Sequence, residues 1–408
     1  MNPTSVVVNS ILQLQRKYSN DGMVPTLEAV NTRIYRDWIL KKGIVSSWVD
    51  QLDPISQEEL ALAEDTVRCS PIDGRYQNVI VKDSDTPNTP DDAFRREDVS
   101  EPFVTSFSDG SVLGPSGLGI VGERPIADTV SDPWHERRRL EVAIASAGAT
   151  HGIRSARRRL FSRSSSTCGS ISASSTYEAV TPIVPQWKNY FHWTVECLLR
   201  VRPLEAYAQH TGIRPTLLIP ASPADWMIEG LNAVGWAGHT ARLREPAVHA
   251  STLVVPSHPE PTPADCQWLQ EMFGVADKQG TERIFISRND ATLRRIVNES
   301  SVKNVLTEYN IRPVVLSDMT VHEQASLFAQ ASLIIAPHGA GLTNCVFSTN
   351  ATVIELYGQK KSTTFQRIAE VNGLKYRRLR CQPQRVDLRV NTNMLEEVIK
   401  ETITSLEP

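Results

Sequence analysis

The sequence predicts an α/β protein in which residues 177–382 form two Rossmann-like halves. From about residue 177, short apolar segments alternate with helix-like segments. The apolar segments are continuous, the pattern of parallel strands that are buried on both faces of a sheet. They are also more numerous than one compact half usually needs, and a proline-rich stretch at 257–266 separates them into two groups. A chain of 408 residues is too long for a single hydrophobic core.

Each half has its own set of predicted strands. The first half, residues 177–258, contains EAVTPIV, PTLLIP and STLVVPS. The second half, residues 259–382, contains RIFISR, RPVVLS, SLIIAP, TVIELYG and LKYRRL. Helix-like segments such as PADWMIEGLNAVGW and TVHEQASLFAQA join most of these strands. The last segment, residues 383–408, contains NTNMLEEVIKETITSLE and is predicted to be a C-terminal helix.

The N-terminal third has no clear pattern. Residues 25–66 look helical, and FVTSFSDGSVLGPSGLGIVG (103–122) has the Gly, Pro and Ser content of small antiparallel strands. Residues 134–163 carry eight arginines against two acidic residues, and a serine-rich stretch of low complexity follows. We therefore expect an irregular region of helices and small strands over 1–133, and an arginine- and serine-rich loop over 134–176.

Composition excludes several classes of protein. The net charge of −3 gives no overall attraction to nucleic acid. The six cysteines are scattered without a CxxC pair, which argues against a zinc ribbon or a disulfide framework and fits a reducing compartment. No apolar run reaches the roughly 18 residues that a membrane-spanning helix needs. The first residues lack the basic-then-apolar order of a signal peptide. We expect a soluble cytoplasmic protein.

The segment IIAPHGAGLTNCVFS (334–348) is the first candidate binding site. An apolar strand ends at Pro337, and His338, Gly339 and Gly341 follow immediately. At the end of a parallel strand, glycine lets the backbone approach a ligand, and the N-terminus of the next helix favours phosphate. Alternatively, the glycines only allow close packing of strand and helix.

Two further strand ends carry candidate ligand contacts. Glu355 lies 16 residues beyond Gly339 and could accept the hydroxyls of a ribose. Ser287 and Arg288 end the strand in RIFISRND, and a guanidinium there could bind a diphosphate with two parallel hydrogen bonds. Glu355 could equally be an ordinary strand-end carboxylate, and Arg288 a plain surface charge.

The segment NYFHWTVECLLRV is a candidate catalytic helix. His192, Glu196 and Arg200 fall at helical spacing and would form one polar stripe, while Pro203 is expected to kink or end the helix. A His–Glu pair on an otherwise apolar helix is costly to bury unless it is paired or used. The carboxylate could orient the imidazole as a general base. The alternative is a purely structural pair.

Together, YFHWTVECLLR, FISRNDATLRRIVNE and PHGAGLTNCVFSTNATVIELYG resemble the signature blocks of glycosyltransferase family 61 in their order and approximate spacing. The resemblance covers about residues 177–360, and the string HGAGLTN followed by VIEL is its most specific part. The first block departs where Leu199 replaces a proline that is frequent in the family. The resemblance implies a GT-B-like architecture, with two Rossmann-like domains facing a cleft and the nucleotide sugar in the C-terminal half. It also implies inverting transfer without a catalytic metal.

The resemblance suggests roles for the candidate residues. His192 or Glu196 would be the catalytic base. The donor-binding residues would be Ser287, Arg288, His338, Gly339, Ala340, Gly341, Leu342, Thr343, Asn344 and Glu355. No metal site is expected, because the only DxD motif, Asp83–Asp85, lies in an acidic loop far upstream. No cofactor is expected either, since the nucleotide sugar is a substrate.

The expected partners are a nucleotide sugar and a glycan or lipid-linked saccharide acceptor, in the assembly of surface or extracellular polysaccharide. The arginine cluster Arg137–Arg163 could add a peripheral contact with anionic lipid. Two other functions remain open. One is another nucleotide-binding enzyme, an NAD-dependent oxidoreductase or a sugar-nucleotide epimerase, although the third glycine of G-x-G-x-x-G is missing. The other is a non-catalytic glycan-binding protein that has kept the fold.

Overall fold

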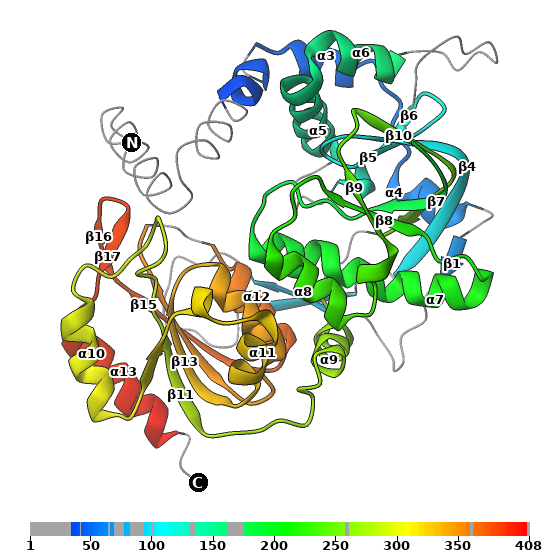
Figure 1. Ribbon diagram of the computed structural model, residues 1–408. Helices are drawn as coiled ribbons and strands as arrows, with labels where there is room; N and C mark the ends of the chain where they lie inside the picture. Colours follow the sequence, from blue (N-terminus) through cyan, green and yellow to red (C-terminus); the bar gives the residue numbers. More distant parts are fainter. Residues whose placement is uncertain are drawn as a thin grey trace. The chain divides into compact units, whose positions relative to one another are not determined.

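The computed structural model contains two compact units. It describes residues 34–40, 42–63, 66–68, 77–81, 94–98, 102–130, 136–161, 175–257, 261–359 and 362–405. The N-terminal unit lies within Leu27–Gly74 and Ser100–Glu260, and the C-terminal unit contains Arg75–Val99 and Pro261–Pro408 (Figure 1). The division falls inside the proline-rich segment 257–266. No helix in the described segments is both long and apolar enough to cross a membrane.

The N-terminal unit is built on one mixed sheet. Its strands follow the order β6-β5-β4-β10-β7-β8-β9, and β1 also pairs with β4. The four strands β10, β7, β8 and β9 run parallel, whereas β4, β5, β6 and β1 add antiparallel pairs. The strands are β1 (Thr66–Arg68), β4 (Phe103–Leu113), β5 (Leu118–Val121), β6 (Arg124–Ile126), β7 (Thr176–Pro182), β8 (Thr216–Pro220), β9 (Thr240–Leu243) and β10 (Ala247–Pro256).

The small N-terminal strands therefore belong to the same sheet as the first Rossmann-like half. The long strand β4 pairs with β10 along nearly its whole length, from Val104 opposite Pro256 to Leu113 opposite Ala247. The antiparallel strands that the sequence predicts in 103–122 are confirmed. The predicted separation of these strands from the first Rossmann-like half is not confirmed. Pairing between segments so far apart along the chain leaves no local signal in the sequence.

Most of the predicted arginine-rich loop is helical. Helix α5 spans Glu136–His151 and α6 spans Ile153–Phe161, so the expectation of a loop over 134–176 does not hold for residues 136–161. Alanine and arginine both favour helix, and the apolar side of α5 packs into a core with residues of α3 (Ile44–Val49). Arg137, Arg138 and Arg139 are paired with Asp50, Glu141 and Asp128 respectively. The serine-rich residues 162–174 lie outside the described residues.

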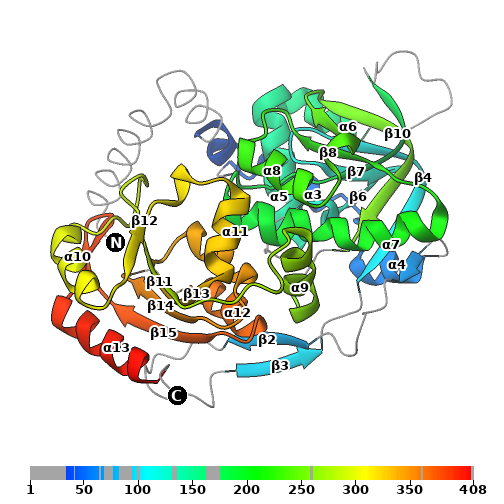
Figure 2. The same ribbon diagram turned by 60° about the horizontal axis from the view of Figure 1, so that its bottom comes forward.

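The C-terminal unit has a five-stranded, fully parallel sheet in the order β12-β11-β13-β14-β15. Together with the first sheet, it confirms the predicted α/β class. Helices cover both faces, with α10 and α13 on one face and α11 and α12 on the other (Figures 1 and 2). The elements are β11 (Glu282–Ile286), α10 (Glu299–Glu308), β12 (Arg312–Val314), α11 (Val321–Ala329), β13 (Ala331–Pro337), β14 (Thr352–Tyr357), α12 (Thr364–Val371), β15 (Lys375–Arg380) and α13 (Thr392–Thr404).

Local signals fix several element boundaries. Capping boxes begin α9 (Pro263–Met272) at Thr262 and α11 at Thr320, and each satisfies backbone amides that the helix leaves unpaired. The segment 383–408 is not helical throughout, because β16 (Gln382–Gln384) and β17 (Asp387–Arg389) form a hairpin before α13. Asn391 caps α13 by accepting from Asn393 and Met394.

Candidate active site

Two strands of the C-terminal sheet end beside each other and are followed by predicted donor-binding residues. Ser287 and Arg288 follow β11, and His338 and Gly339 follow β13. The two strands are paired in parallel, and the strand order reverses between them because β12 lies on one side of β11 and β13 on the other. In open parallel sheets, ligands bind outside the carboxyl ends of the strands at this switch point. The fold thus brings these two segments to the position where it favours a ligand.

Gly339 is glycine because Arg288 occupies the space that a side chain would need. A Cβ atom on residue 339 would lie 2.1 Å from Nη1 of Arg288 and 2.7 Å from its Cζ. The guanidinium donates from Nε and Nη2 to the carbonyl oxygen of Leu293, both at 3.2 Å. Desolvation by burial, together with the charge of Arg294, lowers the pKa of Arg288 to about 10. Arg288 is therefore a partly desolvated cation held against the glycine turn, and not a plain surface charge.

The helix after the turn is a 3₁₀-helix, η6 (Ala340–Phe347). Gly339 precedes it in an extended conformation, and no side chain caps it. Within the described part of the chain, the backbone amides of Ala340 and Gly341 make no hydrogen bond. The first turn of this helix therefore leaves main-chain donors for an anion.

The later residues of the predicted turn are interior residues. Leu342, Thr343 and Asn344 are fully buried. The side-chain amide of Asn344 donates to Oε1 of Gln324 on α11 at 2.8 Å. These three side chains therefore anchor η6 in the core, and only its beginning is available for ligand contact.

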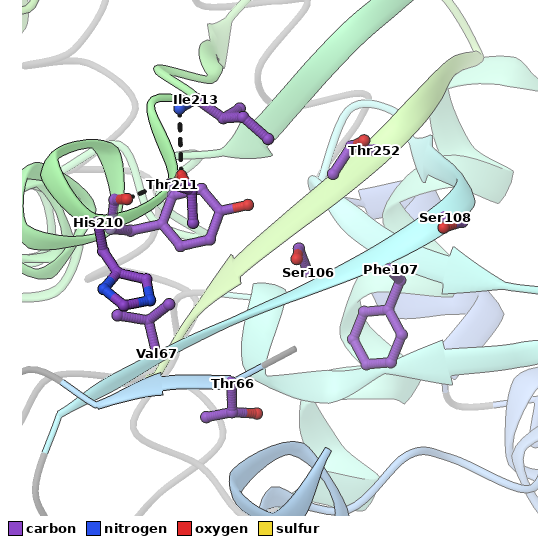
Figure 3. Close-up of a pocket in the computed structure, with 10 residues that line it drawn as sticks. Thr66, Val67, Ser106, Phe107, Ser108, His210, Thr211, Ile213 and Thr252 are labelled. Atoms are coloured by element: carbon purple, nitrogen blue, oxygen red, sulfur yellow. Dashed lines mark hydrogen bonds between the residues drawn. The ribbon is translucent and has the colours of Figure 1, made fainter. Parts of the chain in front are cut away.

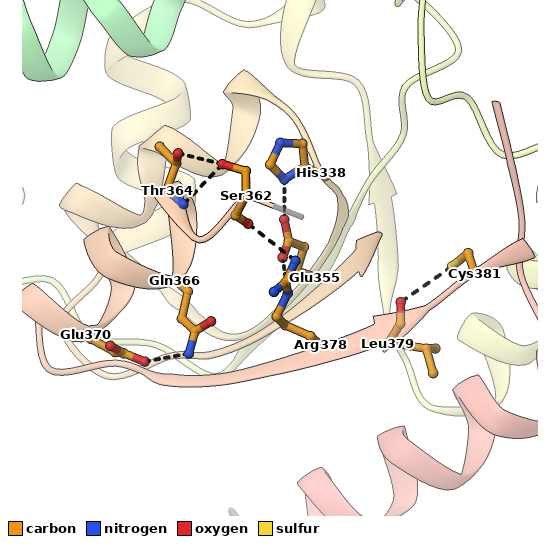
Figure 4. A network of polar contacts seen from close by, with 9 residues as sticks. All are labelled: His338, Glu355, Ser362, Thr364, Gln366, Glu370, Arg378, Leu379 and Cys381. Carbon is orange, nitrogen blue, oxygen red and sulfur yellow. Dashed lines mark hydrogen bonds and ion pairs between the residues drawn. The ribbon is translucent and has the colours of Figure 1, made fainter. Parts of the chain in front are cut away.

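Glu355 lies in a buried polar network (Figure 4). One carboxylate oxygen contacts Nδ1 of His338, and the other accepts from Nε of Arg378 at 3.0 Å. Arg378 also donates to the carbonyl oxygen of Ser362 at 3.3 Å, and the ring of Phe365 lies edge-on to His338. Glu355 is only 1% exposed, so both of its oxygens are engaged inside the protein. Its observed role is to hold His338 at the end of β13.

Replacing Glu355 with alanine is expected to lower the free energy of unfolding by about 3–5 kcal/mol, because the buried His338 and the partly buried Arg378 both lose the carboxylate that they contact. Urea denaturation monitored by circular dichroism measures this change. Glu401→Ala is the matched control, since its partner Arg377 is half-exposed on the same strand as Arg378. That variant should lose less than about 1 kcal/mol. Equal losses of unfolding free energy in the two variants would contradict the assignment of Glu355 to a buried polar network.

Ser287 also has an internal partner. Its hydroxyl donates to Oε1 of Glu299 at 2.9 Å, and Asn289 donates to the same oxygen at 2.9 Å. Glu299 is the first residue of α10 and forms an ion pair with Lys303. This cluster fixes the turn after β11 and so sets the direction of Arg288.

Arg294 is a further charged residue beside Arg288, although it was not among the predicted site residues. It has a left-handed backbone with φ of 57°, uncommon for a residue other than glycine, and its amide donates to Val386 on the hairpin. Its Nε is buried without a hydrogen-bond partner among the described residues. Burial lowers the pKa of Arg294, while the charge of Glu355 raises it. The only signal in the sequence is the Arg294–Arg295 pair between β11 and α10.

In the N-terminal unit, His192 and Glu196 form the predicted pair. Nδ1 of His192 lies 2.8 Å from Oε1 of Glu196, and the side chains are 17% and 5% exposed. Because an ionised carboxylate only accepts hydrogen bonds, Nδ1 carries the proton and Nε2 is left as an acceptor. The arrangement is that of an oriented general base.

The helix that carries this pair is not α-helical. Residues His192–Cys197 form the π-helix η2, in which Leu198 donates to Trp193 five residues earlier. A 3₁₀ turn, η3 (Leu198–Arg200), follows, and then helix α7 (Val201–Thr211). Pro203 in the first turn of α7 cannot donate an amide and crowds the preceding turn, which disfavours continuous α-helix there. Arg200, the third residue of the predicted polar stripe, is fully buried.

A pocket of about 420 Å³ lies at the far end of α7 (Figure 3). Hydroxyl-bearing residues of three strands and the carboxyl end of the helix form much of its wall. The lining residues are Thr66, Val67, Ser106, Phe107, Ser108, Tyr207, His210, Thr211, Ile213 and Thr252. An 11-residue helix is about 16 Å long, so the pocket and His192 lie at opposite ends of α7. None of the predicted site residues lines it.

The described residues contain no group of three or more His, Cys, Asp and Glu placed to hold a metal ion. Asp83 and Asp85 lie outside the described residues. Residues 190–354 match the model of the family described as Glycosyltransferase 61. The match includes every predicted site residue except Glu355, which follows its last position. No curated protein gives a significant match to the chain.

Proposed function

Because the chain belongs to glycosyltransferase family 61 through residues 190–354, we propose that it transfers a sugar, with inversion, from a nucleotide sugar to a hydroxyl of a glycan or lipid-linked saccharide. The observation that supports this proposal most is the position of Arg288 beside the uncapped start of η6, at the switch point of the C-terminal sheet. We also propose the GT-B-like arrangement that the resemblance implies, and a cytoplasmic role in surface polysaccharide assembly.

The donor diphosphate is proposed to bind at the carboxyl ends of β11 and β13. Arg288 can form two parallel hydrogen bonds to phosphate oxygens, and the amides of Ala340 and Gly341 can donate to others. Arg294 adds a second positive charge beside Arg288. Two guanidinium groups and a helix N-terminus supply the positive potential that a leaving diphosphate needs, so we propose transfer without a metal or another cofactor.

His192 is proposed as the base, with Glu196 orienting it. The acceptor oxygen forms a bond to the anomeric carbon as the bond from that carbon to the diphosphate breaks. The acceptor proton passes to Nε2 of His192, and the negative charge that develops on the diphosphate is stabilised by Arg288. For Ser287 and Glu355 we propose positioning roles, toward Arg288 and His338, in place of direct donor contacts.

A thermal-shift panel of UDP-, GDP- and CMP-sugars against NAD and NADP tests the function class. One nucleotide sugar should raise the melting temperature, because a ligand that binds only the folded protein stabilises it. Stabilisation by NAD or NADP alone would favour an oxidoreductase or epimerase. No shift with any of these compounds would favour a non-catalytic glycan-binding protein.

We propose that α6 carries the expected contact with anionic lipid. Arg154, Arg157 and Arg158 are exposed on this helix, and within the described residues none of them forms an ion pair with an acidic side chain. The arginines of α5 form ion pairs with acidic side chains, so they contribute less to the proposed lipid contact.

Changing Arg154 and Arg157 to glutamine should weaken sedimentation with phosphatidylserine vesicles roughly 30-fold, since each basic residue near the surface contributes about 1 kcal/mol. The control changes Arg242 and Arg244, which are exposed elsewhere in the same unit, and should leave binding unchanged. Equal binding of all three proteins would remove the proposed lipid contact.

A further inference from the structure

The pocket at the far end of α7 is lined mainly by neutral polar residues. Its volume of about 420 Å³ lies within the roughly 300–1,000 Å³ of small-molecule sites. Six of the ten described residues that line it carry a hydroxyl group, and none of the ten is Asp, Glu, Lys or Arg. Small-molecule sites are usually lined mostly by apolar side chains, so this composition points to a polar ligand.

One wall of the pocket is a patch of hydroxyl groups on β4 and β10. Ser106 and Ser108 are two residues apart on β4 and therefore share a face of the sheet, and Thr252 on β10 is paired directly with Ser108 (Figure 3). Side chains in such positions lie only about 5–7 Å apart. Within the described segments, the hydroxyl groups of these three residues make no hydrogen bond. One small ligand can therefore contact all three.

The other wall is the carboxyl end of α7. Tyr207, His210 and Thr211 are three or four residues apart and share one face of the helix. Tyr207 is only 1% exposed, yet its phenol oxygen is accessible to solvent and makes no hydrogen bond to any described residue. A buried tyrosine hydroxyl usually has a hydrogen-bond partner. The unused hydroxyl of Tyr207 therefore indicates that a ligand atom binds there, whereas the hydroxyls of Thr66 and Thr211 already donate to main-chain carbonyls.

The surroundings favour a ligand without net charge. An anion would find no Lys or Arg among the described lining residues, and the carboxyl end of a helix carries a partial negative charge that repels it. A cation would find no carboxylate on the same wall. An apolar ligand would leave the hydroxyls of Ser106, Ser108, Tyr207 and Thr252 without partners, which costs free energy for each. A neutral molecule with several hydroxyl groups meets all these constraints, because each hydroxyl both donates and accepts.

We propose that this pocket binds a neutral sugar unit of a glycan, at a site separate from the reaction centre. A sugar ring offers hydroxyls to the four unpaired hydroxyls of the pocket, and apolar C–H groups to Val67 and Ile213. The pocket and His192 lie at opposite ends of α7, and no residue proposed for the transfer reaction lines the pocket. The inference therefore goes beyond the proposed function and does not depend on it.

Calorimetric titration with neutral oligosaccharides tests the inference. The full-length protein, without a nucleotide sugar, is titrated with maltopentaose, cellopentaose, xylopentaose and mannopentaose, and with oligogalacturonate as the anionic comparison. At least one neutral oligosaccharide should bind, and it should bind more tightly than oligogalacturonate. If none of the neutral oligosaccharides binds, or if oligogalacturonate binds more tightly than all of them, the inference is wrong.

Two variants then locate the bound oligosaccharide. Tyr207→Phe removes a single oxygen, so binding should weaken about fivefold, the equivalent of about 1 kcal/mol for one hydrogen bond. The melting temperature should not fall, because that oxygen has no partner among the described residues. Ser108→Ala should weaken binding by a similar factor. Tyr177→Phe, a partly buried tyrosine of β7 outside the pocket, is the matched control and should leave binding unchanged.

Normal binding in both Tyr207→Phe and Ser108→Ala would place the oligosaccharide outside this pocket and would overturn the inference. Weaker binding in Tyr177→Phe of the same size would do so as well, because the effect would then not be specific to the pocket. A failure of the proposed function is a separate result. These titrations contain no nucleotide sugar and measure no transfer, so a protein without transferase activity should still bind the oligosaccharide.

Discussion

The His192→Ala variant is expected to lose sugar transfer by a factor of about 10²–10⁴ while it still binds the donor, because general-base catalysis contributes acceleration of this size. His192 lies in the N-terminal unit, whereas the proposed donor contacts are residues of the C-terminal unit. The loss should therefore appear in kcat, with the donor dissociation constant unchanged. Steady-state kinetics and calorimetric titration with the donor measure the two quantities separately.

The Glu196→Gln variant tests the orienting role of Glu196 and is expected to have a smaller effect than His192→Ala. It keeps the size of the side chain and its hydrogen bond to Nδ1 but removes the negative charge. Its kcat should lie between those of the wild type and His192→Ala. A His192→Ala variant that transfers sugar at the normal rate, or that fails to bind the donor, would contradict the assignment of His192 as the base.

The second large effect concerns Arg288. Changing it to alanine should weaken donor binding roughly 30-fold or more. Removing one partner of a desolvated charge pair costs about 2 kcal/mol or more, and this energy corresponds to that change in the dissociation constant. Arg288→Lys should restore little, because an ammonium group cannot bind phosphate through two parallel hydrogen bonds while also donating to Leu293. Calorimetric titration with the nucleoside diphosphate measures both variants.

Gly339→Ala offers a sharper version of this test. The new methyl group would lie 2.1 Å from Nη1 of Arg288, so the guanidinium must move while the fold can remain. The variant should therefore weaken donor binding in the wild-type background and have little further effect in Arg288→Ala. Such non-additivity is expected only when two residues act through the same contact. Fully additive losses would mean that Gly339 and Arg288 act separately.

Much of the C-terminal unit could be predicted from the sequence. Strands such as β13 are continuously apolar and end abruptly at polar or glycine residues, so their carboxyl ends could be located. The spacing of His192 and Glu196 also predicted their contact, because residues four apart meet on either an α-helix or a slightly wider π-helix.

Other features depend on partners that are distant in the sequence. Glu355 looked available for a ribose because nothing nearby reveals that His338 and Arg378 take both of its oxygens. The pairing of β4 with β10 joins segments separated by more than a hundred residues. The helical state of α5 depended on packing against α3 and on acids such as Asp50, which the local arginine count could not reveal.

A crystal structure with the nucleoside diphosphate that gives the largest thermal shift tests the central claim most directly. The diphosphate oxygens should lie within hydrogen-bonding distance of the Arg288 guanidinium and of the amides of Ala340 and Gly341, at the carboxyl end of β13. A diphosphate bound away from that strand end would contradict the claim, even if sugar transfer were demonstrated.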